Sequence, residues 1–390
     1  MSETRVGPGA SIRLGTVRGD LTVGAGTVIE GEDASGAHVE GRVDFRGSAE
    51  VDCDLGCESL EGEGIVRVQG NLRVREAVEV EDSLYVLRDM SAGEAEVGGR
   101  MSVGGSLDCD EVVVGGSVEV GGDLRARSVE VGGRLEVTGR AELGDLDVGE
   151  RVSLGGGGRV DGDVEVGGTF TSGSALSFET IEVGGVVELG PGSVGGRVEV
   201  GGRLESSGDL TCREVEVGGD ARIAGDLKGE SVEVAGRLSV SGALELSSSL
   251  EVGGSAEVRG ELKARDARVG GDYRGTRGVV SGSVEVAGGI ETTVGLRAWA
   301  IELHRGAVCR GPLVADRIEV GKGCRTEDLY AREIFVEKNS SVGRLFAERV
   351  TVADRCSVAE VHYTAELDVS EKAALAKPAE RVQSLPPFPL

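Results

Sequence analysis

The chain has 390 residues, a formal net charge of −26, 67 glycines and only 3% aromatic residues. This acidic charge, together with the absence of any cluster of basic residues in the sequence, argues against nucleic acid as a partner. Residues 1–20 lack the apolar core of a secretory signal and no run of eighteen apolar residues occurs, so we expect a cytoplasmic protein without direct membrane insertion.

Residues 1–9 are predicted to be an N-terminal extension, and residues 10–295 a glycine-rich repeat array. The phrase Val-Glu-Val-Gly-Gly at Val164 comes back every seventeen residues, at Ile181, Val198, Val215 and Val232. A fixed period of this length indicates a solenoid. Each repeat holds three pairs of alternating apolar residues, which is typical of short strands with one buried face, and glycines between the pairs suit corners.

Three strands and three corners per repeat predict an all-β fold, a single-stranded triangular β-helix (β-solenoid) with a 17-residue repeat. A helical fold is excluded because no 3.6-residue stripe appears and glycine interrupts every few residues. About 21 coils at roughly 4.8 Å each would make a rod on the order of 100 Å long around an aliphatic column. We expect this array to be one domain.

Residues 296–366 are predicted to be glycine-poor C-terminal coils of the same β-helix, with steps that shorten to sixteen residues. Most aromatic residues gather here on outward positions. An apolar ladder on an acidic rod indicates either a partner surface or a surface that the C-terminal tail covers. The candidate interface residues, the last of them in the tail, are Val314, Tyr330, Phe335, Phe346, His362 and Phe388.

Residues 367–390 are predicted to be a short helix followed by a proline-rich tail. Ser370 is a suitable N-cap for one or two helical turns over 369–377, which Pro378 would end. The prolines of the last six residues favour an extended, polyproline-like segment that cannot join a sheet as a central strand. This segment either caps the last coil or docks onto a neighbour.

Metal and disulfide chemistry finds little support among the seven cysteines, an odd number in a chain without a secretory signal. Six of them fall on inward positions of the repeat, where cysteine acts as a small apolar residue. These are Cys57, Cys109, Cys212, Cys309, Cys324 and Cys356. Cys53 alone lies at a corner, too little for a tetrahedral metal site, and we predict no metal ligands.

Outward carboxylates stack from coil to coil. They are Glu130, Asp147, Glu165, Glu182, Glu199, Glu216 and Glu233. Neighbours about 4.8 Å apart repel one another, so salt, bound cations or the nearby Arg134, Arg203 and Arg237 should screen them. We interpret this column as a solvated face that limits sideways association, in preference to a cation site.

No catalytic arrangement can be assembled on the repeat. His38, His304 and His362 are scattered, and the Gly-Gly pairs recur as corners, so none reads as a phosphate loop. We therefore predict no catalytic residues, no cofactor and no enzyme. The enzymatic rival, a hexapeptide-repeat acyltransferase, would favour coils of eighteen residues and a loop with a catalytic histidine.

Uninterrupted coils of about seventeen residues, an Ile/Val-x-Val-x-Gly corner, no catalytic insert, a short proline-containing tail and cytoplasmic character resemble the bactofilins, polymer-forming cytoskeletal proteins. The resemblance covers about residues 43–366. It implies a right-handed β-helix that assembles end to end into nucleotide-independent filaments, which scaffold cell shape or position partners. The chain departs from the family in having about three times the usual number of coils and no long N-terminal tail or membrane-targeting segment.

Self-association is expected on physical grounds as well, because an uncapped first coil, around Ser11–Leu14, would present unpaired backbone groups to another chain. Further protein partners are expected at the C-terminal coils and the tail. The main hypothesis is therefore a structural scaffold that polymerises with itself. The alternative is a monomeric acidic β-helix that acts as a binding platform or spacer.

Overall fold

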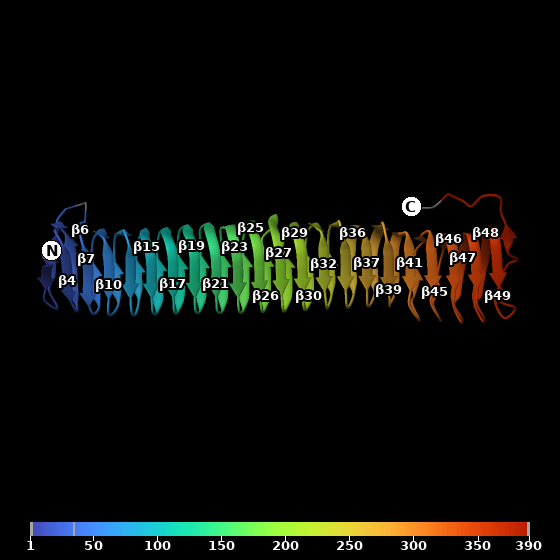
Figure 1. Ribbon diagram of the computed structural model, residues 1–390, viewed down its shortest axis with the longest axis horizontal. Helices are drawn as coiled ribbons and strands as arrows, with labels where there is room; N and C mark the ends of the chain where they lie inside the picture. The colour runs from blue at the N-terminus through green and yellow to red at the C-terminus, as the bar shows by residue number, and fades with distance from the viewer. Residues whose placement is uncertain (1–2, 34–35, 388–390) are drawn as a thin grey trace. The chain divides into compact units, whose positions relative to one another are not determined.

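The computed structural model describes residues 3–33 and 36–387, and these contain fifty short β-strands and no helix (Figure 1). The chain falls into two compact units, residues 1–195 and 196–390. In a solenoid each turn contacts only the turns next to it, so each compact unit is held together by contacts between adjacent turns. Each unit is a parallel β-solenoid, and the described residues make about 22 turns with a repeat near 17 residues.

One turn of the first unit shows how the three sides form. It consists of β10 (Ser59–Gly62), β11 (Val66–Val68) and β12 (Leu72–Val74). Each of these three strands is paired in parallel with the corresponding strand of the next turn. On the first side, for example, Leu60 is the register partner of Val78. Alternate residues of a strand, such as Val66 and Val68, are buried, while the residue between them, Arg67, faces outward. The alternation predicted from the sequence is therefore confirmed.

One residue is inserted before Val164, which lies eighteen positions after its register partner Leu146 where the usual step is seventeen. Strand β21 (Ala141–Val148) pairs with β23 (Gly158–Val166), and the register shifts between Leu143 and Leu146. A bulge takes up the extra residue, so that Leu146 still faces Val164 and the buried faces stay in phase.

All seven cysteines are free thiols, and the six assigned to inward positions are buried. Burial raises the pKa of Cys57, Cys109, Cys212 and Cys309 to about 12. Such thiols are core residues that stay protonated at neutral pH, because reactive cysteines need an exposed and stabilised thiolate. Cys53 is half-buried at its corner.

The corners contain a coupling between aspartate and glycine that the sequence reasoning missed. A carboxylate at the start of a strand accepts the backbone N–H of the residue seventeen positions later, as Asp226 does from Ala243 (2.8 Å). The residue just before that N–H is glycine, and a Cβ on Gly242 would lie 2.1 Å from the Asp226 Oδ1. The same pair of contacts recurs at Asp54, Asp89, Asp123, Asp209 and Asp266. These glycines are therefore required for room beside a carboxylate.

The glycine-poor coils continue the solenoid in steps of sixteen residues. Their strands include β43 (Leu313–Val314), β44 (Arg317–Val320), β46 (Leu329–Val336), β47 (Ser341–Val352) and β48 (Ser357–Val369). The inward residues Leu313, Leu329, Leu345 and Val361 are register partners in that order.

Two expected segments at the ends of the chain are corrected. Among the described residues of the expected extension 1–9, β1 (Glu3–Val6) pairs with β4 (Asp20–Gly24) and so belongs to the first turn of the solenoid. The helix predicted over 369–377 is absent. Instead β49 (Ala374–Leu375) and β50 (Glu380–Arg381) both pair in parallel with β48.

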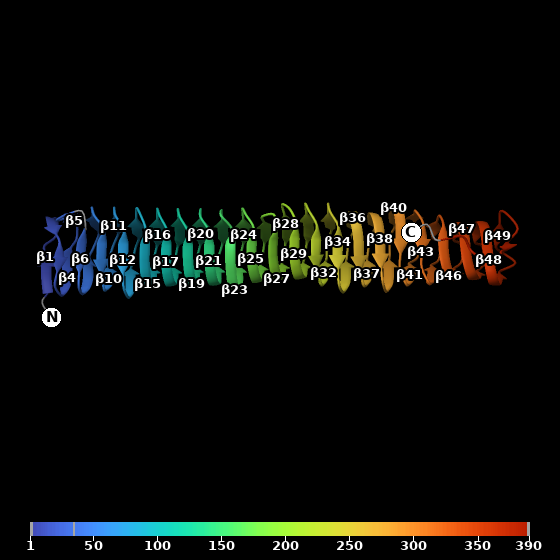
Figure 2. The same cartoon turned by 90° about the horizontal axis from the view of Figure 1, so that it is seen from above.

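The reason for the missing helix lies at Ser370. Its hydroxyl donates to Asp354 (2.5 Å) and accepts the backbone N–H of Lys372 (3.2 Å), which fixes a turn in place of a helix cap. The free edge of β48 then offers backbone partners that outweigh local helix propensity. After β50 the tail runs back along the C-terminal coils of its unit (Figures 1 and 2).

Candidate interaction surface of the C-terminal coils

The outward column predicted in the glycine-poor coils is present. Val314, Tyr330, Phe346 and His362 are successive register partners on β43, β46, β47 and β48. The rings of Tyr330 and Phe346 stack with centroids 4.7 Å apart and planes within 7°, and those of Phe346 and His362 stack at 4.9 Å within 5°. We call these four residues the aromatic column. Stacking at the strand spacing makes it one continuous ladder.

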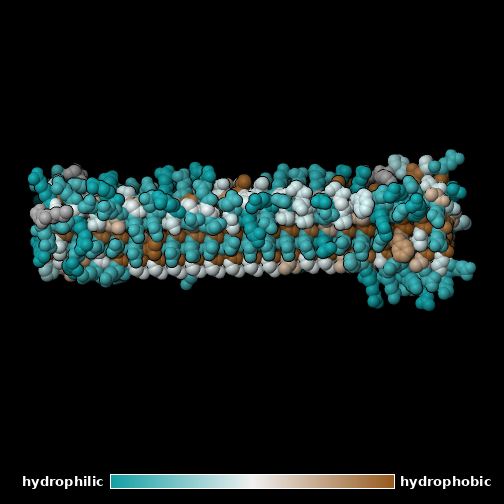
Figure 3. Space-filling view, viewed as in Figure 1, coloured by the Kyte–Doolittle hydropathy of each residue, from teal (hydrophilic) through white to brown (hydrophobic). Residues whose placement is uncertain are grey.

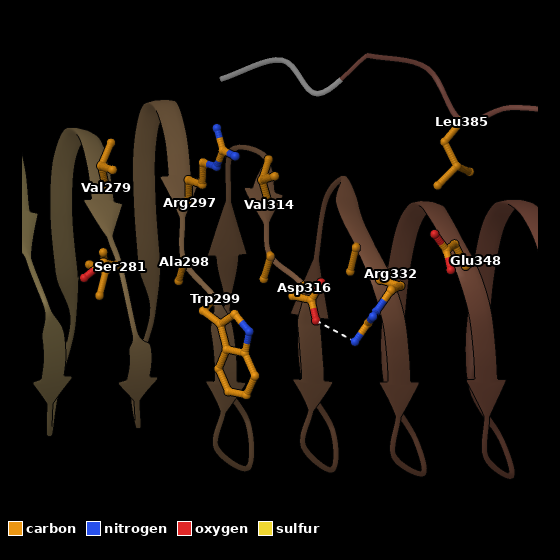
Figure 4. A pocket seen from close by; sticks show the side chains of 13 residues that line it. Val279, Ser281, Arg297, Ala298, Trp299, Val314, Asp316, Arg332, Glu348 and Leu385 are labelled. Carbon is orange, nitrogen blue, oxygen red and sulfur yellow. Dashed lines mark ion pairs between the residues drawn. The ribbon is translucent and has the colours of Figure 1, made fainter.

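The aromatic column is not an open face. Val314 is only 2% exposed, and the three rings are half-buried. Leu385 of the returning tail lines the same hollow as Val314 and points toward the coils (Figure 4). Burial raises the pKa of the Tyr330 hydroxyl. The tail thus lies beside the column, while Phe388 is outside the described residues and its place at an interface stays a prediction.

His362 ends the aromatic column and faces two carboxylates. Its Nδ1 lies 3.4 Å from Glu380 on β50, and its Nε2 lies 3.6 Å from Glu360 on its own strand. Lys377 also contacts Glu360, and its hydrogen bond holds the pKa of that carboxyl below its usual value. This cluster of charged groups joins the tail strand to the last long strand of the solenoid.

A hollow of about 490 Å³ beside the column contains the chain's single tryptophan. Trp299 lies at the corner between β40 (Ile290–Arg297) and β41 (Ala300–Leu303), and it is 60% exposed (Figure 4). Asp316 and Arg332 form an ion pair of 2.9 Å on the same wall. The sequence reasoning did not include Trp299, although one tryptophan in a chain so poor in aromatic residues is a signal that could have found it.

Phe335 does not join the aromatic column. It lies on β46, but its register partners are Glu319 and Thr351, so it belongs to another side of the coil. It is 43% exposed in a separate hollow, among the ion pairs of Arg317 with Glu319 and of Arg349 with Glu333. Figure 3 shows hydrophilic side chains over most of the face in view, with hydrophobic ones in a band along the coils that includes the C-terminal coils.

The predicted column of outward carboxylates is found in each unit. Glu130, Asp147, Glu165 and Glu182 are successive partners in the first unit, and Glu216, Glu233 and Glu251 in the second. Two of the arginines expected to screen this column contact other residues. Arg203 pairs with Glu205, and Arg237 donates its Nε–H to Ser255.

Arg197 takes that role in the second unit, with ion pairs to Glu199 (3.0 Å), Glu214 (3.0 Å) and Glu216 (2.9 Å). Its position two residues before Glu199 places it on the same outward row, because side chains two apart in a strand share a face. One arginine against three exposed carboxylates leaves the face acidic.

The described residues offer little to catalysis. His38 in the first unit and His304 in the second are both exposed, and neither lies in a charged cluster like that of His362. No group of three or more His, Cys, Asp or Glu side chains in residues 3–33 and 36–387 is arranged to hold a metal ion.

The described part of the chain has no helix long and apolar enough to cross a bilayer. Among known proteins, residues 180–272 match the family described as Bactofilin, polymer-forming cytoskeletal. No curated protein and no solved structure matches the chain. The matched stretch covers coils with the seventeen-residue repeat, from β25 (Leu176–Val183) on past β37 (Asp266–Val269).

Proposed function

We propose that this chain of the bactofilin family is a structural, non-enzymatic subunit that assembles end to end, without nucleotide, into cytoplasmic filaments. Such filaments would serve as a scaffold that sets cell shape or positions partner proteins. The family match supports a polymer-forming cytoskeletal role. The observation that carries the end-to-end geometry is an open backbone edge on the first turn.

That edge belongs to β1, β2 (Ser11–Leu14) and β3 (Thr16–Val17), which pair on one side with β4, β5 (Thr27–Gly31) and β6 (Ala37–Val39). Within residues 3–33 and 36–387, the registers described for β1, β2 and β3 are all with β4, β5 and β6, so their other side is open. Strand edges of this kind recruit further strands, since every unpaired N–H and C=O gains a partner.

Charge favours joining at the ends over joining at the sides. The outward carboxylates run along the side of each unit, and two such faces repel each other over about 10 Å at 0.1 M salt. The edge of the first turn instead offers neutral backbone groups. A subunit can therefore grow by its end while its sides keep neighbours apart.

Arg13 in β2 provides a matched test of this edge. The carbonyls of Ala10 and Leu14 accept N–H groups of Val28 and Glu32, so the N–H of Arg13, one residue before Leu14, points away from β5. Arg13→Pro removes this outward donor, and Arg13→Ala keeps it while losing the same ion pair to Glu30.

In sedimentation velocity, Arg13→Ala should assemble like the wild type and Arg13→Pro should remain a single chain. Equal assembly of the two variants would show that growth does not use this edge.

A second function, a binding platform for other proteins, is favoured by the exposure of Trp299 beside its hollow. Tryptophan is the residue most enriched at interface hot spots. Trp299→Ala should leave the assembly of the wild type unchanged if this surface serves partners. A loss of assembly would instead place Trp299 in the contact between subunits.

A further inference from the structure

We propose that residues 370–387 are a detachable cap on the last turn of the solenoid, and that a second copy of this chain docks on the same edge when the cap leaves. We call this segment the terminal cap. The inference rests on the proposed self-assembly and deepens it, because it names the second docking edge and what controls access to it.

The terminal cap is held to β48 by a few backbone hydrogen bonds. Ala374 donates its N–H to the carbonyl of Cys356 (2.8 Å), and Ala376 donates to Val358 (2.9 Å). Val382 donates to Tyr363 (2.8 Å). These bonds occupy the outer edge of β48 on two sides of the turn, which is the position that a further coil would take.

The strands of the cap are much shorter than the strand β48 with which they pair. β49 and β50 have two residues each, against thirteen in β48. In β49, Ala374 is exposed and Leu375 half-buried over Val358, which is itself fully buried. Few apolar contacts and exposed backbone bonds are the marks of a segment that opens at low free-energy cost.

The third side of the last turn has no cap. Leu367 and Val369 are register partners of Val350 and Val352 in the preceding turn. Within the described residues, no strand pairs with the other edge of Leu367 and Val369. Leu367 and Val369 are half-buried, whereas Val350 and Val352 are at most 2% exposed. The last turn therefore already offers an open edge with apolar residues beside it, next to the two sides that the cap fills.

The ion pairs of the cap are at the surface, so salt should weaken them. Lys377 pairs with Glu360, and the cap's Lys372 pairs with Asp354 (3.5 Å). The two lysines are 68% and 70% exposed. Exposed pairs contribute little and are screened by salt. Higher salt thus loosens the cap and at the same time reduces repulsion between acidic chains.

A second copy fits this edge better than the cap does. Its first turn carries β1 to β3, whose outer edges are open, and strands of the same solenoid can continue the parallel pairing on all three sides. The contact would join two different surfaces, the first turn of one copy and the last turn of the next. Contacts of that kind repeat without closing and generate open filaments.

The test compares two full-length variants by sedimentation over a concentration series. Ala376→Pro with Val382→Pro removes two N–H donors of the cap, and Ser384→Pro is the control, since the Ser384 N–H makes no described backbone bond. Two ordinary hydrogen bonds correspond to roughly a tenfold change in an equilibrium constant, so the double variant should assemble at a concentration about tenfold lower than wild type. Assembly at the wild-type concentration would overturn the inference.

An engineered disulfide between the cap and β48, which we call the lock, tests the inference independently, because the same protein can be compared in its oxidised and reduced states. Ser357 and Ala374 are register partners and both exposed, so Ser357→Cys with Ala374→Cys should form a disulfide that holds the cap closed. With half-buried Cys53 replaced by Ser in all samples, the oxidised protein should assemble less than the same protein after reduction. Equal assembly in both states would overturn the inference.

The two proposals fail in different ways. If the wild type assembles and neither the proline pair nor the lock changes it, the cap is passive and the proposed function stands. If no form assembles, with the cap closed or released, both proposals are wrong. If only the released forms assemble, the cap controls a polymer whose resting subunit is a single chain.

Discussion

Replacement of Leu227 by Asp tests the assignment of inward positions most severely. Leu227 begins β31 (Leu227–Gly229), is 1% exposed and pairs with Leu210 and Leu244 of the adjacent turns. Loss of the leucine side chain costs about 2–5 kcal/mol. An unpaired carboxylate in the apolar column adds several kcal/mol more. For a unit of this size each kcal/mol lowers the melting temperature by about 2–4 °C, so Leu227→Asp should lower it by roughly 10 °C or more.

The neighbouring Lys228 supplies the control, because it points outward and is 54% exposed. Lys228→Asp should shift the melting temperature by no more than about 2 °C, since surface changes are usually within 0.5 kcal/mol. Thermal unfolding followed by circular dichroism measures both variants, and hydrogen exchange shows whether the loss is centred on the turns around β31. Similar melting temperatures for the two variants would refute the inward and outward assignment.

Four further predictions concern single residues. Tyr273 is 2% exposed with a hydroxyl that has no described partner, so Tyr273→Phe should stabilise the protein by about 1 kcal/mol in thermal unfolding; a destabilised variant would mean that the hydroxyl is satisfied. Gly242→Ala should destabilise by about 1–3 kcal/mol, because its Cβ would overlap a carboxylate oxygen, and an unchanged melting temperature would contradict this packing. The pKa of Asp266 is held low, first by the backbone N–H of Ser283, so the ionised carboxylate stabilises the fold above about pH 4 and this stabilisation is lost as the pH falls below that. The difference in unfolding free energy between wild type and Asp266→Ala should therefore shrink in acid. A difference that grows in acid would contradict this pKa direction. Phe346→Glu should leave thermal unfolding nearly unchanged while weakening self-association or partner binding in sedimentation, and unaltered assembly would mean that the aromatic column serves only the tail.

Much of the solenoid could be predicted because the alternation of inward and outward residues is a local pattern that repeats in every turn. A strand with one buried face shows period-two alternation wherever it occurs, so the inward assignment of Cys57 or Leu227 needs no knowledge of distant contacts. Even the bulge before Val164 follows from counting, since one extra residue would turn every later side chain to the wrong face. The order of the aromatic column followed from the same grid.

The parts that could not be predicted depend on contacts that no repeat encodes. The segment after Ser370 has acceptable helix propensity, and only the free edge of β48 makes paired strands the better outcome. The role of the corner aspartates requires the positions of backbone N–H groups one turn later, which residue spacing alone does not reveal. Screening by Arg197 depends on where one long side chain reaches.

The central claim, that the chain joins to itself through its ends, is tested most directly by negative-stain electron microscopy of the purified protein across a salt series. If the chain joins through its ends, we expect unbranched filaments that are longer at higher salt, because salt screens the repulsion between acidic chains and loosens the terminal cap. Single particles at every salt and protein concentration, or sheets joined side to side, would contradict it.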